Sequence, residues 1–431
     1  MLRATWSSLA AVVALNTLAA VTGCRDGPTS AVPASEPEQS VYAIPCLADV
    51  SNLGLRCGAA TTDPQAGASL AGGEIIVGEQ GVYVLLESSN VSYDGSQVFQ
   101  ADVTLQNLIG QKLGTRDGTT LATEGIRIFF HTGPDVTSGS GSVVVSNADG
   151  TADFTGSNQP YHQYDEILAP DQVSQAKTWT WDVEPSVMTF QFTVYVWAPI
   201  QYENGWVDVS PTDPEVGIGL TEMLSAVVRN RLGQEVNGRT VTWSSSDPSI
   251  ADVDPSTGEL SGVAEGTCTV CASSSGPEAD GCVTVTVKPV VYVRTLADPE
   301  NPAVGATSGI TLELDVTQIS EPLISMVGDV TWDASLLDYL DDASGSIWDL
   351  LVANEDPPGT LAFSAASALG VSGDVLSALT FTVEALAQNC TDLMPTLTEL
   401  AAIDPVTFET IDLLQRAIII TEPVNVCVVA P

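Results

Sequence analysis

The chain has 431 residues, and 54 Asp and Glu against 13 Lys and Arg give it a formal net charge of −41 at pH 7. Nucleic acid and anionic lipid repel a charge of this sign, which argues against both as direct partners. The length suggests about two to four domains. Abundant carboxylates alone specify no calcium site, so we expect no resident cofactor and leave calcium open.

The first residues are typical of an export signal. Arg3 precedes an apolar stretch from Leu9 to Val21 that is too short to span a bilayer, and small residues lead into Cys24. The segment LAAVTGC, Leu18 to Cys24, resembles the bacterial lipobox, although Val21 stands where that motif more often has Leu. A plain signal peptide cleaved nearby is the alternative.

The lipobox resemblance implies that residues 1–23 are a lipoprotein signal peptide and that the Cys24 sulfur carries a lipid. The protein would be secreted and anchored to the bacterial cell envelope, at the outer membrane or the cell surface. Only this lipid would contact the membrane. Residues 24–40 are polar and rich in Pro and Ser, so we expect them to form a disordered tether.

The remainder of the chain favours β-strands over helices. Short segments that alternate apolar with polar residues recur, for example at 81–88, 190–198 and 282–288, whereas helical spacing is hard to find. We therefore expect an all-β protein with three β-sandwich domains in series.

Cysteine spacing predicts disulfide bridges in the two outer domains. An exported chain oxidises most of its cysteines, and setting Cys24 aside leaves seven of the eight. Their spacing pairs Cys46 with Cys57, and Cys390 with Cys427.

Three further cysteines lie in the middle of the chain. If the neighbouring valines face the core, Cys271 and Cys282 lie on the solvent face of adjacent strands and are the better pair. Cys268 is then a small buried hydrophobe. Because neither a histidine nor a fourth cysteine is near, we predict no zinc site and no other metal site.

The first module, residues 41–204, is expected to be a β-sandwich of no family that we recognise. Trp179 and Trp181 share one strand face, where such a pair either stacks on a sugar ring or belongs to the core. No nucleophile motif accompanies His162 or His131, so both are interpreted as ordinary loop and strand histidines.

The second module, residues 205–288, carries a family resemblance. The matching segments are Val241–Asp254 (VTWSSSDPSIADVD), Thr257–Val270 (TGELSGVAEGTCTV) and the strand Val283–Val287. They resemble a group 2 bacterial immunoglobulin-like domain, in which Trp243 would fill the space between two sheets. The family implies a spacer in surface proteins and adhesins.

The third module, residues 289–423, is followed by an expected tail at 424–431. Its matching segments are Val330–Leu340 (VTWDASLLDYL), Gly359–Val383 (GTLAFSAASALGVSGDVLSALTFTV) and Thr398–Ile411 (TELAAIDPVTFETI). They resemble the cohesin-like jelly-roll sandwich, whose superfamily includes certain carbohydrate-binding modules. Cellulosomal relatives bind a calcium-loaded dockerin, and the sister modules bind cellulose on a flat aromatic strip.

These features together predict a non-enzymatic binding or adhesion protein of the cell surface, in which an Ig-like spacer displays a cohesin-like recognition domain. The expected partner is a dockerin-like protein domain or a surface polysaccharide. Carbohydrate binding in support of polysaccharide breakdown is the alternative function. We do not expect an enzyme, because no nucleophile, base and orienting group occur together.

Overall fold

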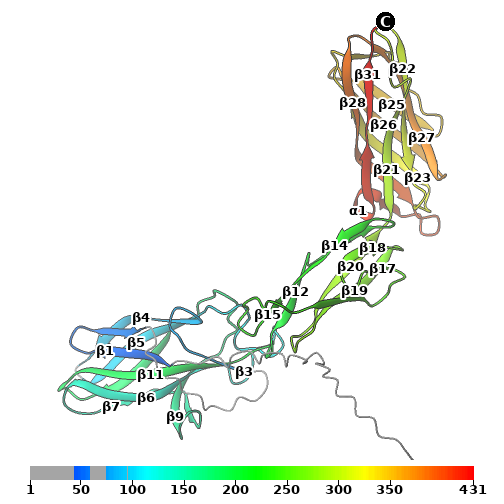
Figure 1. Ribbon diagram of the computed structural model, residues 1–431. Helices are drawn as coiled ribbons and strands as arrows, with labels where there is room; N and C mark the ends of the chain where they lie inside the picture. The colour runs from blue at the N-terminus through cyan, green and yellow to red at the C-terminus, as the bar shows by residue number, and fades with distance from the viewer. Residues whose placement is uncertain (1–42, 59–73, 95) are drawn as a thin grey trace, which may run out of the picture.

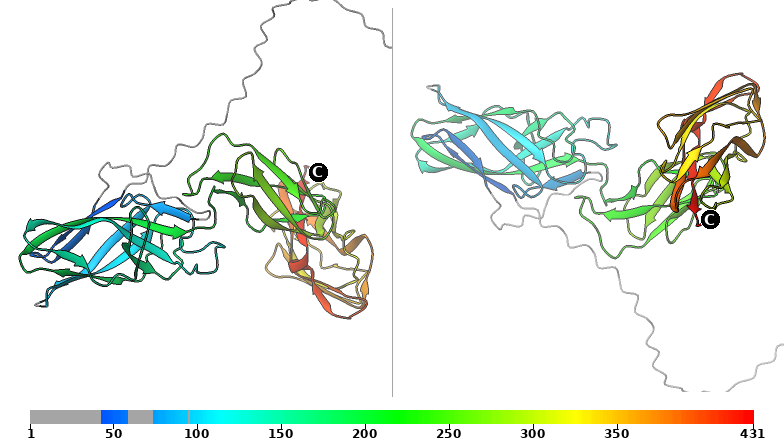
Figure 2. Two further views of the ribbon diagram at one scale, coloured as in Figure 1. Left: turned by 90° about the horizontal axis from the view of Figure 1, so that it is seen from below. Right: turned by 90° about the horizontal axis from the view of Figure 1, so that it is seen from above.

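The computed structural model describes residues 43–58, 74–94 and 96–431, and within these ranges the protein is almost entirely β-structure. Three bodies follow one another in a bent row (Figure 1), and the first body stays apart from the other two in the views of Figure 2. The predicted signal peptide, Cys24 and the whole expected tether lie outside the described residues. The all-β fold with sandwich domains in series is confirmed.

The first body is a sandwich of two sheets. Its seven-stranded sheet has the order β2-β1-β11-β6-β9-β8, with β3 also paired to β11, and its second sheet has the order β4-β5-β10-β7. The strands are β1 (Ile44–Asp49), β2 (Gly54–Cys57), β3 (Glu74–Val77), β4 (Val84–Tyr93), β5 (Val98–Asn107), β6 (Ile126–Gly139), β7 (Val143–Val145), β8 (Gly150–Ala152), β9 (Gln159–Tyr164), β10 (Lys177–Val183) and β11 (Val187–Pro199).

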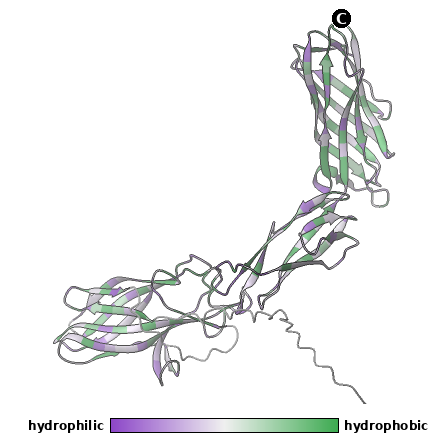
Figure 3. Ribbon diagram, in the orientation of Figure 1, coloured by the Kyte–Doolittle hydropathy of each residue, from purple (hydrophilic) through white to green (hydrophobic). Residues whose placement is uncertain are grey.

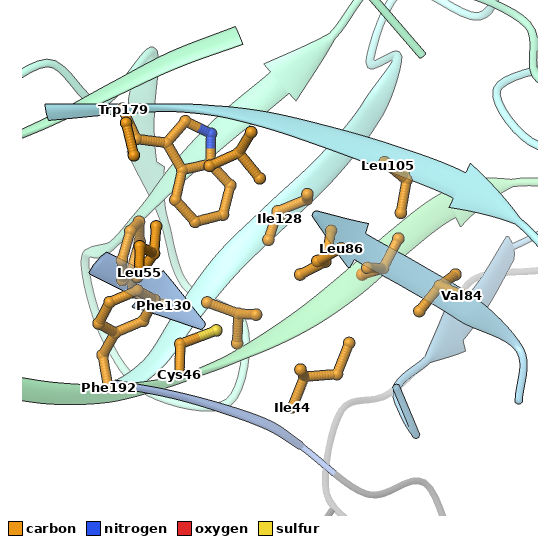
Figure 4. Packing of buried hydrophobic residues seen from close by; sticks show 14 of the residues in the cluster. Ile44, Cys46, Leu55, Val84, Leu86, Leu105, Ile128, Phe130, Trp179 and Phe192 are labelled. Carbon is orange, nitrogen blue, oxygen red and sulfur yellow. The ribbon is translucent and has the colours of Figure 1, made fainter. Parts of the chain in front are cut away.

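Aromatic rings fill the space between these two sheets (Figure 4). Phe130 on β6 lies 5.6 Å from Trp179 on β10, and Trp181 lies 5.5 Å from Phe192 on β11, measured between ring centroids. Alternate residues of a strand point to the same face, so β10 delivers both tryptophans to the core. Tilted ring packing of this kind adds to the free energy gained from burying the rings.

The second body is smaller and is built from short strands in three sheets, with orders β12-β15, β13-β20-β19-β16 and β14-β18-β17. Trp243, Val270 and Val285 lie in its core. The strands are β12 (Trp206–Ser210), β13 (Glu215–Gly217), β14 (Thr221–Met223), β15 (Ser225–Arg229), β16 (Val241–Ser245), β17 (Ala251–Val253), β18 (Glu259–Gly262), β19 (Gly266–Ser274) and β20 (Gly281–Lys288).

The third body is again a sandwich of two sheets, with orders β24-β27-β22-β21-β30 and β25-β26-β23-β28-β29; β31 also pairs with β28. The elements are β21 (Val290–Asp298), β22 (Thr307–Asp315), β23 (Leu323–Thr331), β24 (Leu337–Tyr339), β25 (Leu350–Glu355), β26 (Thr360–Val371), β27 (Val375–Ala385), β28 (Asn389–Ile403), β29 (Thr410–Asp412), α1 (Leu413–Arg416), β30 (Ile418–Glu422) and β31 (Val424–Val428).

The expected tail at 424–431 is wrong for its first residues. Residues 424–428 form β31, which pairs with β28. Val424 lies opposite Leu393, and Val428 lies opposite Asn389. Val426 is fully buried in the third core. The apolar alternation of VNVCV, together with a disulfide between the two strands, makes this segment part of the sandwich.

Both junctions between the bodies involve direct contacts. Leu232 of the second body packs into the first core, and the Gly110 amide donates to its carbonyl at 2.8 Å. Only Pro289 separates β20 from β21. At that second junction Arg416 forms an ion pair with Glu265 at 2.9 Å. The bodies are therefore coupled by specific contacts as well as by the chain.

We expect Trp181→Ala to lower the free energy of unfolding of the first body by about 3–5 kcal/mol, because the substitution leaves a cavity between the sheets. Trp181 is fully buried. The control is Leu369→Ala, whose side chain is 91% exposed and should change stability by less than about 0.5 kcal/mol. Urea denaturation with hydrogen exchange of β10 peptides measures both. Equal stability of the two variants would contradict the packing described.

Candidate functional site

A chemical centre was sought first among the titratable side chains. In the described ranges, no group of three or more His, Cys, Asp or Glu residues is placed to hold a metal ion. The same part of the chain has no helix long and apolar enough to cross a membrane. The remaining candidates are the site residues predicted from the sequence and the exposed surfaces.

Trp179 and Trp181 do not form a glycan-stacking face. Both side chains are 0% exposed, and their rings lie 6.1 Å apart inside the first sandwich. A sugar would have to separate the two sheets to reach them. The carbohydrate interpretation of this pair is wrong, because the face of β10 that they share is the inward face.

His162 lies beside the tryptophans in the same core. Its ring stacks on Trp179 with centroids 4.7 Å apart, and its Nδ1 atom is 3.7 Å from Asp149 Oδ2. Burial lowers the pKa of His162 to about 4, against the opposing pull of Asp149. Asp149 itself pairs with Lys177 at 2.8 Å. His162 is therefore neutral at pH 7 and packs as an aromatic residue.

His131 is also part of the packing of the first body. Its Nδ1 atom lies 2.6 Å from Thr155 Oγ1, and its ring lies 5.0 Å from that of Tyr195. These contacts give the ring a structural role at the edge of the aromatic cluster.

Six of the cysteines form disulfide bonds between paired strands. Disulfides join Cys46 to Cys57, Cys271 to Cys282 and Cys390 to Cys427, in each case between adjacent antiparallel strands. Cys268 is free and 7% exposed, within the core of the second body. These bridges hold hairpins and edges together and present no reactive thiol at the surface.

The outer face of the sheet β25-β26-β23-β28 is the most distinctive surface of the third body. Strand alternation turns one set of residues outward, and the register places them in rows across the sheet. We call this set the outer face. Its members are Leu350, Val352, Asn354, Ala362, Ser364, Ala366, Ser325, Val327, Asp329, Thr331, Met394, Thr396 and Glu399.

Aliphatic and small side chains dominate this outer face. Leu350 is 61% exposed, Val352 57% and Met394 41%. One row runs from Val352 through Ser364 and Val327 to Glu399. Within the set, only Asp329 and Glu399 are ionisable, and Glu399 accepts a hydrogen bond from Ser325. In a chain of net charge −41, this surface is unusually poor in charge.

The opposite sheet of the same sandwich shows the contrast. On its outer side Arg294 pairs with Glu422 and lies 3.2 Å from Asp315 Oδ2 and 3.7 Å from Glu313 Oε1. Its guanidinium also lies 4.7 Å from the ring of Tyr292. The outer side of this sheet thus carries an ion-pair cluster around Arg294, together with the exposed Leu296. Figure 3 colours each residue of the ribbon by hydropathy.

The sequence analysis did not predict this outer face, although the segment 350–355 contained an indication of it. The segment LLVANE at 350–355 has apolar residues at both parities, so a strand there must expose some of them. Leu351 and Ala353 turn toward the core, which leaves Leu350 and Val352 outside. The neighbouring strands supply Ala and Ser, which are too ordinary to stand out in the sequence.

Comparison with known proteins assigns a family to one segment. Residues 206–287 match the bacterial Ig-like domain (group 2). This segment coincides with the second body, from the start of β12 almost to the end of β20. The Ig-like resemblance of this module is therefore confirmed. No curated protein matches the chain.

Solved structures of low identity are similar to between about a third and about a half of the chain. A type II cohesin domain from the cellulosome of Acetivibrio cellulolyticus is 14% identical, covers 32% of this chain and 95% of its own, and has a TM-score of 0.26. A cohesin module from a Clostridium perfringens family 33 glycoside hydrolase is 13% identical over 32% of this chain and 98% of its own, with a TM-score of 0.25.

An adhesin shows a longer but looser similarity. InvE of Yersinia pseudotuberculosis is 15% identical, covers 52% of this chain and 58% of its own, and has a TM-score of 0.17. At these identities the likeness concerns the arrangement of strands.

The buried histidine predicts a pH dependence of stability. The folded-state pKa of His162 is about 4, below its ordinary 6.5, so the unfolded chain binds a proton more readily between these values. The contribution of His162 to the free energy of unfolding is fully present above pH 6.5. It decreases toward pH 4, by about 2 kcal/mol between pH 7 and pH 5. We expect His162→Phe to remove this part of the slope.

The measurement is urea denaturation at a series of pH values, with hydrogen exchange of β9 peptides to localise the transition. Comparison of the variant with the unmodified chain cancels the titration of the many carboxylates. The same slope in both proteins would contradict a neutral, buried His162.

Proposed function

We propose that this protein is an envelope-anchored binding protein whose third body captures a protein partner on its outer face. The observation that carries the proposal is the exposed aliphatic surface around Leu350 and Val352 on an otherwise strongly acidic chain. Large exposed apolar patches are characteristic of interaction sites, since water contact with them is costly.

The composition of the outer face favours a protein over a polysaccharide. Sugar-binding surfaces present aromatic rings to the sugar, and no residue of the outer face is aromatic. Leu, Val, Ala and Met side chains on a flat sheet are suited to packing against the apolar face of a helix or a strand. Ser325 and Thr331 add hydrogen-bonding groups among them.

We propose that the partner is a dockerin-like domain, the class that the sequence resemblance of the third module implies. Low charge on the outer face supports such a partner, because a folded domain would bury little uncompensated carboxylate there. The second body acts as a spacer. Its contacts at both junctions, Leu232 on one side and Arg416 with Glu265 on the other, hold the third body away from the first.

We expect Val352→Lys to weaken capture of the partner at least tenfold, because the substitution puts a charge beside Leu350 among the exposed aliphatic side chains of the outer face. The assay uses the chain with Cys24→Ser as bait, in calcium and with a chelator, against the secreted proteins of the producing bacterium. Mass spectrometry identifies what is retained and whether it carries a dockerin-like module.

The matched control is Ser377→Lys, at an exposed position of β27 on the opposite sheet, which should leave capture unchanged. Equal capture by the two lysine variants would refute the outer face as the docking surface. Capture of no partner with a dockerin-like module would refute the partner class.

Anchoring is tested separately. We expect an alkyne-tagged palmitate analogue fed to expressing bacteria to label the protein and Cys24→Ser to abolish the label and move the protein from the membrane to the soluble fraction. Cys268→Ser is the matched control and should keep the label, since Cys268 is buried in the second core. Labelling of the Cys24→Ser variant would contradict the anchor.

A further inference from the structure

A second candidate site lies between the first and second bodies, far from the outer face. It is a cavity of about 520 Å³, within the range of small-ligand sites. Loops of the first body, the connecting segment at 201–205 and strands β12 and β15 of the second body all contribute to its wall. Ligand sites favour such boundaries, because two bodies supply side chains that neither presents alone.

One wall of the cavity is aromatic. The rings of Tyr202 and Trp206 stack with centroids 5.3 Å apart and an interplanar angle of 29°. Trp206 is only 9% exposed, and its indole Nε1 donates to Asp208 Oδ1 at 2.5 Å. The buried Trp206 thus backs the half-buried Tyr202, whose ring borders the cavity.

Charged groups with hydrogen-bonding capacity to spare complete the lining. The side chain of Asp208 is 47% exposed, and its second oxygen accepts from Arg229 Nε. Arg229 also donates to the Gly233 carbonyl at 3.0 Å. Lys112 donates to the Gly118 carbonyl at 2.8 Å. Carboxylate, guanidinium and ammonium groups each have more sites than these bonds use, so donors and an acceptor face the same space.

The frame around the cavity is held by buried contacts. Gln111 is 5% exposed, and its amide nitrogen donates to the carbonyls of Tyr202 and Arg231 while its oxygen accepts from the Tyr202 amide. Gly110 and Gly233 meet backbone to backbone, and a Cβ on Gly233 would lie 2.5 Å from Gly110 Cα. The aromatic wall is therefore tied to both bodies before any ligand arrives.

We propose that this cavity binds a neutral saccharide unit. A sugar ring offers C–H groups to an aromatic face and hydroxyl groups that both donate and accept, which is the combination that Tyr202, Asp208 and Arg229 present. The Asp208–Arg229 pair leaves the second-body wall close to neutral, and Lys112 adds one cationic donor from the first body.

The proposal is independent of the outer face. The glycan-stacking pair predicted from the sequence lies in a core, whereas Tyr202 and Trp206 come from the connecting segment and from β12. A saccharide held here would sit at the base of the spacer, so that one chain binds a glycan and a protein at different points.

The test uses the chain with Cys24→Ser and saturation-transfer NMR. The probes are glucose, galactose, mannose, xylose and N-acetylglucosamine, together with their β-linked disaccharides. We expect at least one to bind with a Kd on the order of 1 mM or tighter. Tyr202→Ala should weaken that binding at least tenfold, and Tyr202→Phe, which keeps the ring, should retain it.

Two controls separate ligand contact from loss of structure. Tyr292→Ala removes a ring that packs on Arg294 in the third body and should leave sugar binding unchanged. Lys112→Ala changes an exposed side chain at the cavity and should weaken binding a few-fold, with small-angle scattering identical to that of the unmodified chain. Absence of binding by every probe, or equal binding by the Tyr202→Ala variant, would overturn the proposal.

Discussion

The backbone contact between Gly110 and Gly233 fixes how the second body packs against the first. A side chain at either position would collide with the other segment, so the loop after β5 and the loop after β15 meet closely. Leu232 enters the first core beside this contact. These contacts hold the second body against the first. The cavity beside Tyr202 is lined by both bodies, so it depends on this packing, and so does the direction in which the third body extends.

The third body shows how one sandwich can divide its two outer surfaces between different tasks. Arg294 gathers three carboxylates on one side, which keeps that side solvated and compensates part of the negative charge. The other side exposes Leu350 and Val352 among small residues. Since the core between the sheets is closed by residues such as Leu379 and Phe381, exposed apolar groups are not needed for folding. It is this exposure that the proposed capture of a partner would use.

The buried imidazole of His162 packs in the core of the first body as an aromatic ring. His162 stacks on Trp179, and the Asp149–Lys177 pair lies at the rim beside it. The imidazole is kept neutral because the cost of charging it away from water exceeds the attraction of one carboxylate. The histidine beside this aspartate is therefore part of an aromatic core.

Several features were predictable from local pattern. Alternation in segments such as 282–288 predicted strands because period two has one dominant structural solution. The Ig-like module was recognisable because Trp243, the following turn and the last strand recur in order along the chain. Parity and spacing also predicted the pairs that the three disulfides join: Cys46–Cys57 and Cys271–Cys282 are each 11 residues apart, whereas Cys390 and Cys427 are 37 residues apart on β28 and β31.

The sequence by itself thus predicted the all-β class from strand periodicity, the Ig-like module from its family resemblance, and the cysteine pairs from their spacing and parity. Only the tertiary structure decided which side of each strand is covered. It placed Trp179 and Trp181 inside and Leu350 and Val352 outside, a choice that the sequence of either strand leaves open. It also brought Tyr202, Asp208 and Arg229 around one cavity. Whether a face is buried depends on a second sheet or body, and strand periodicity carries no information about that packing.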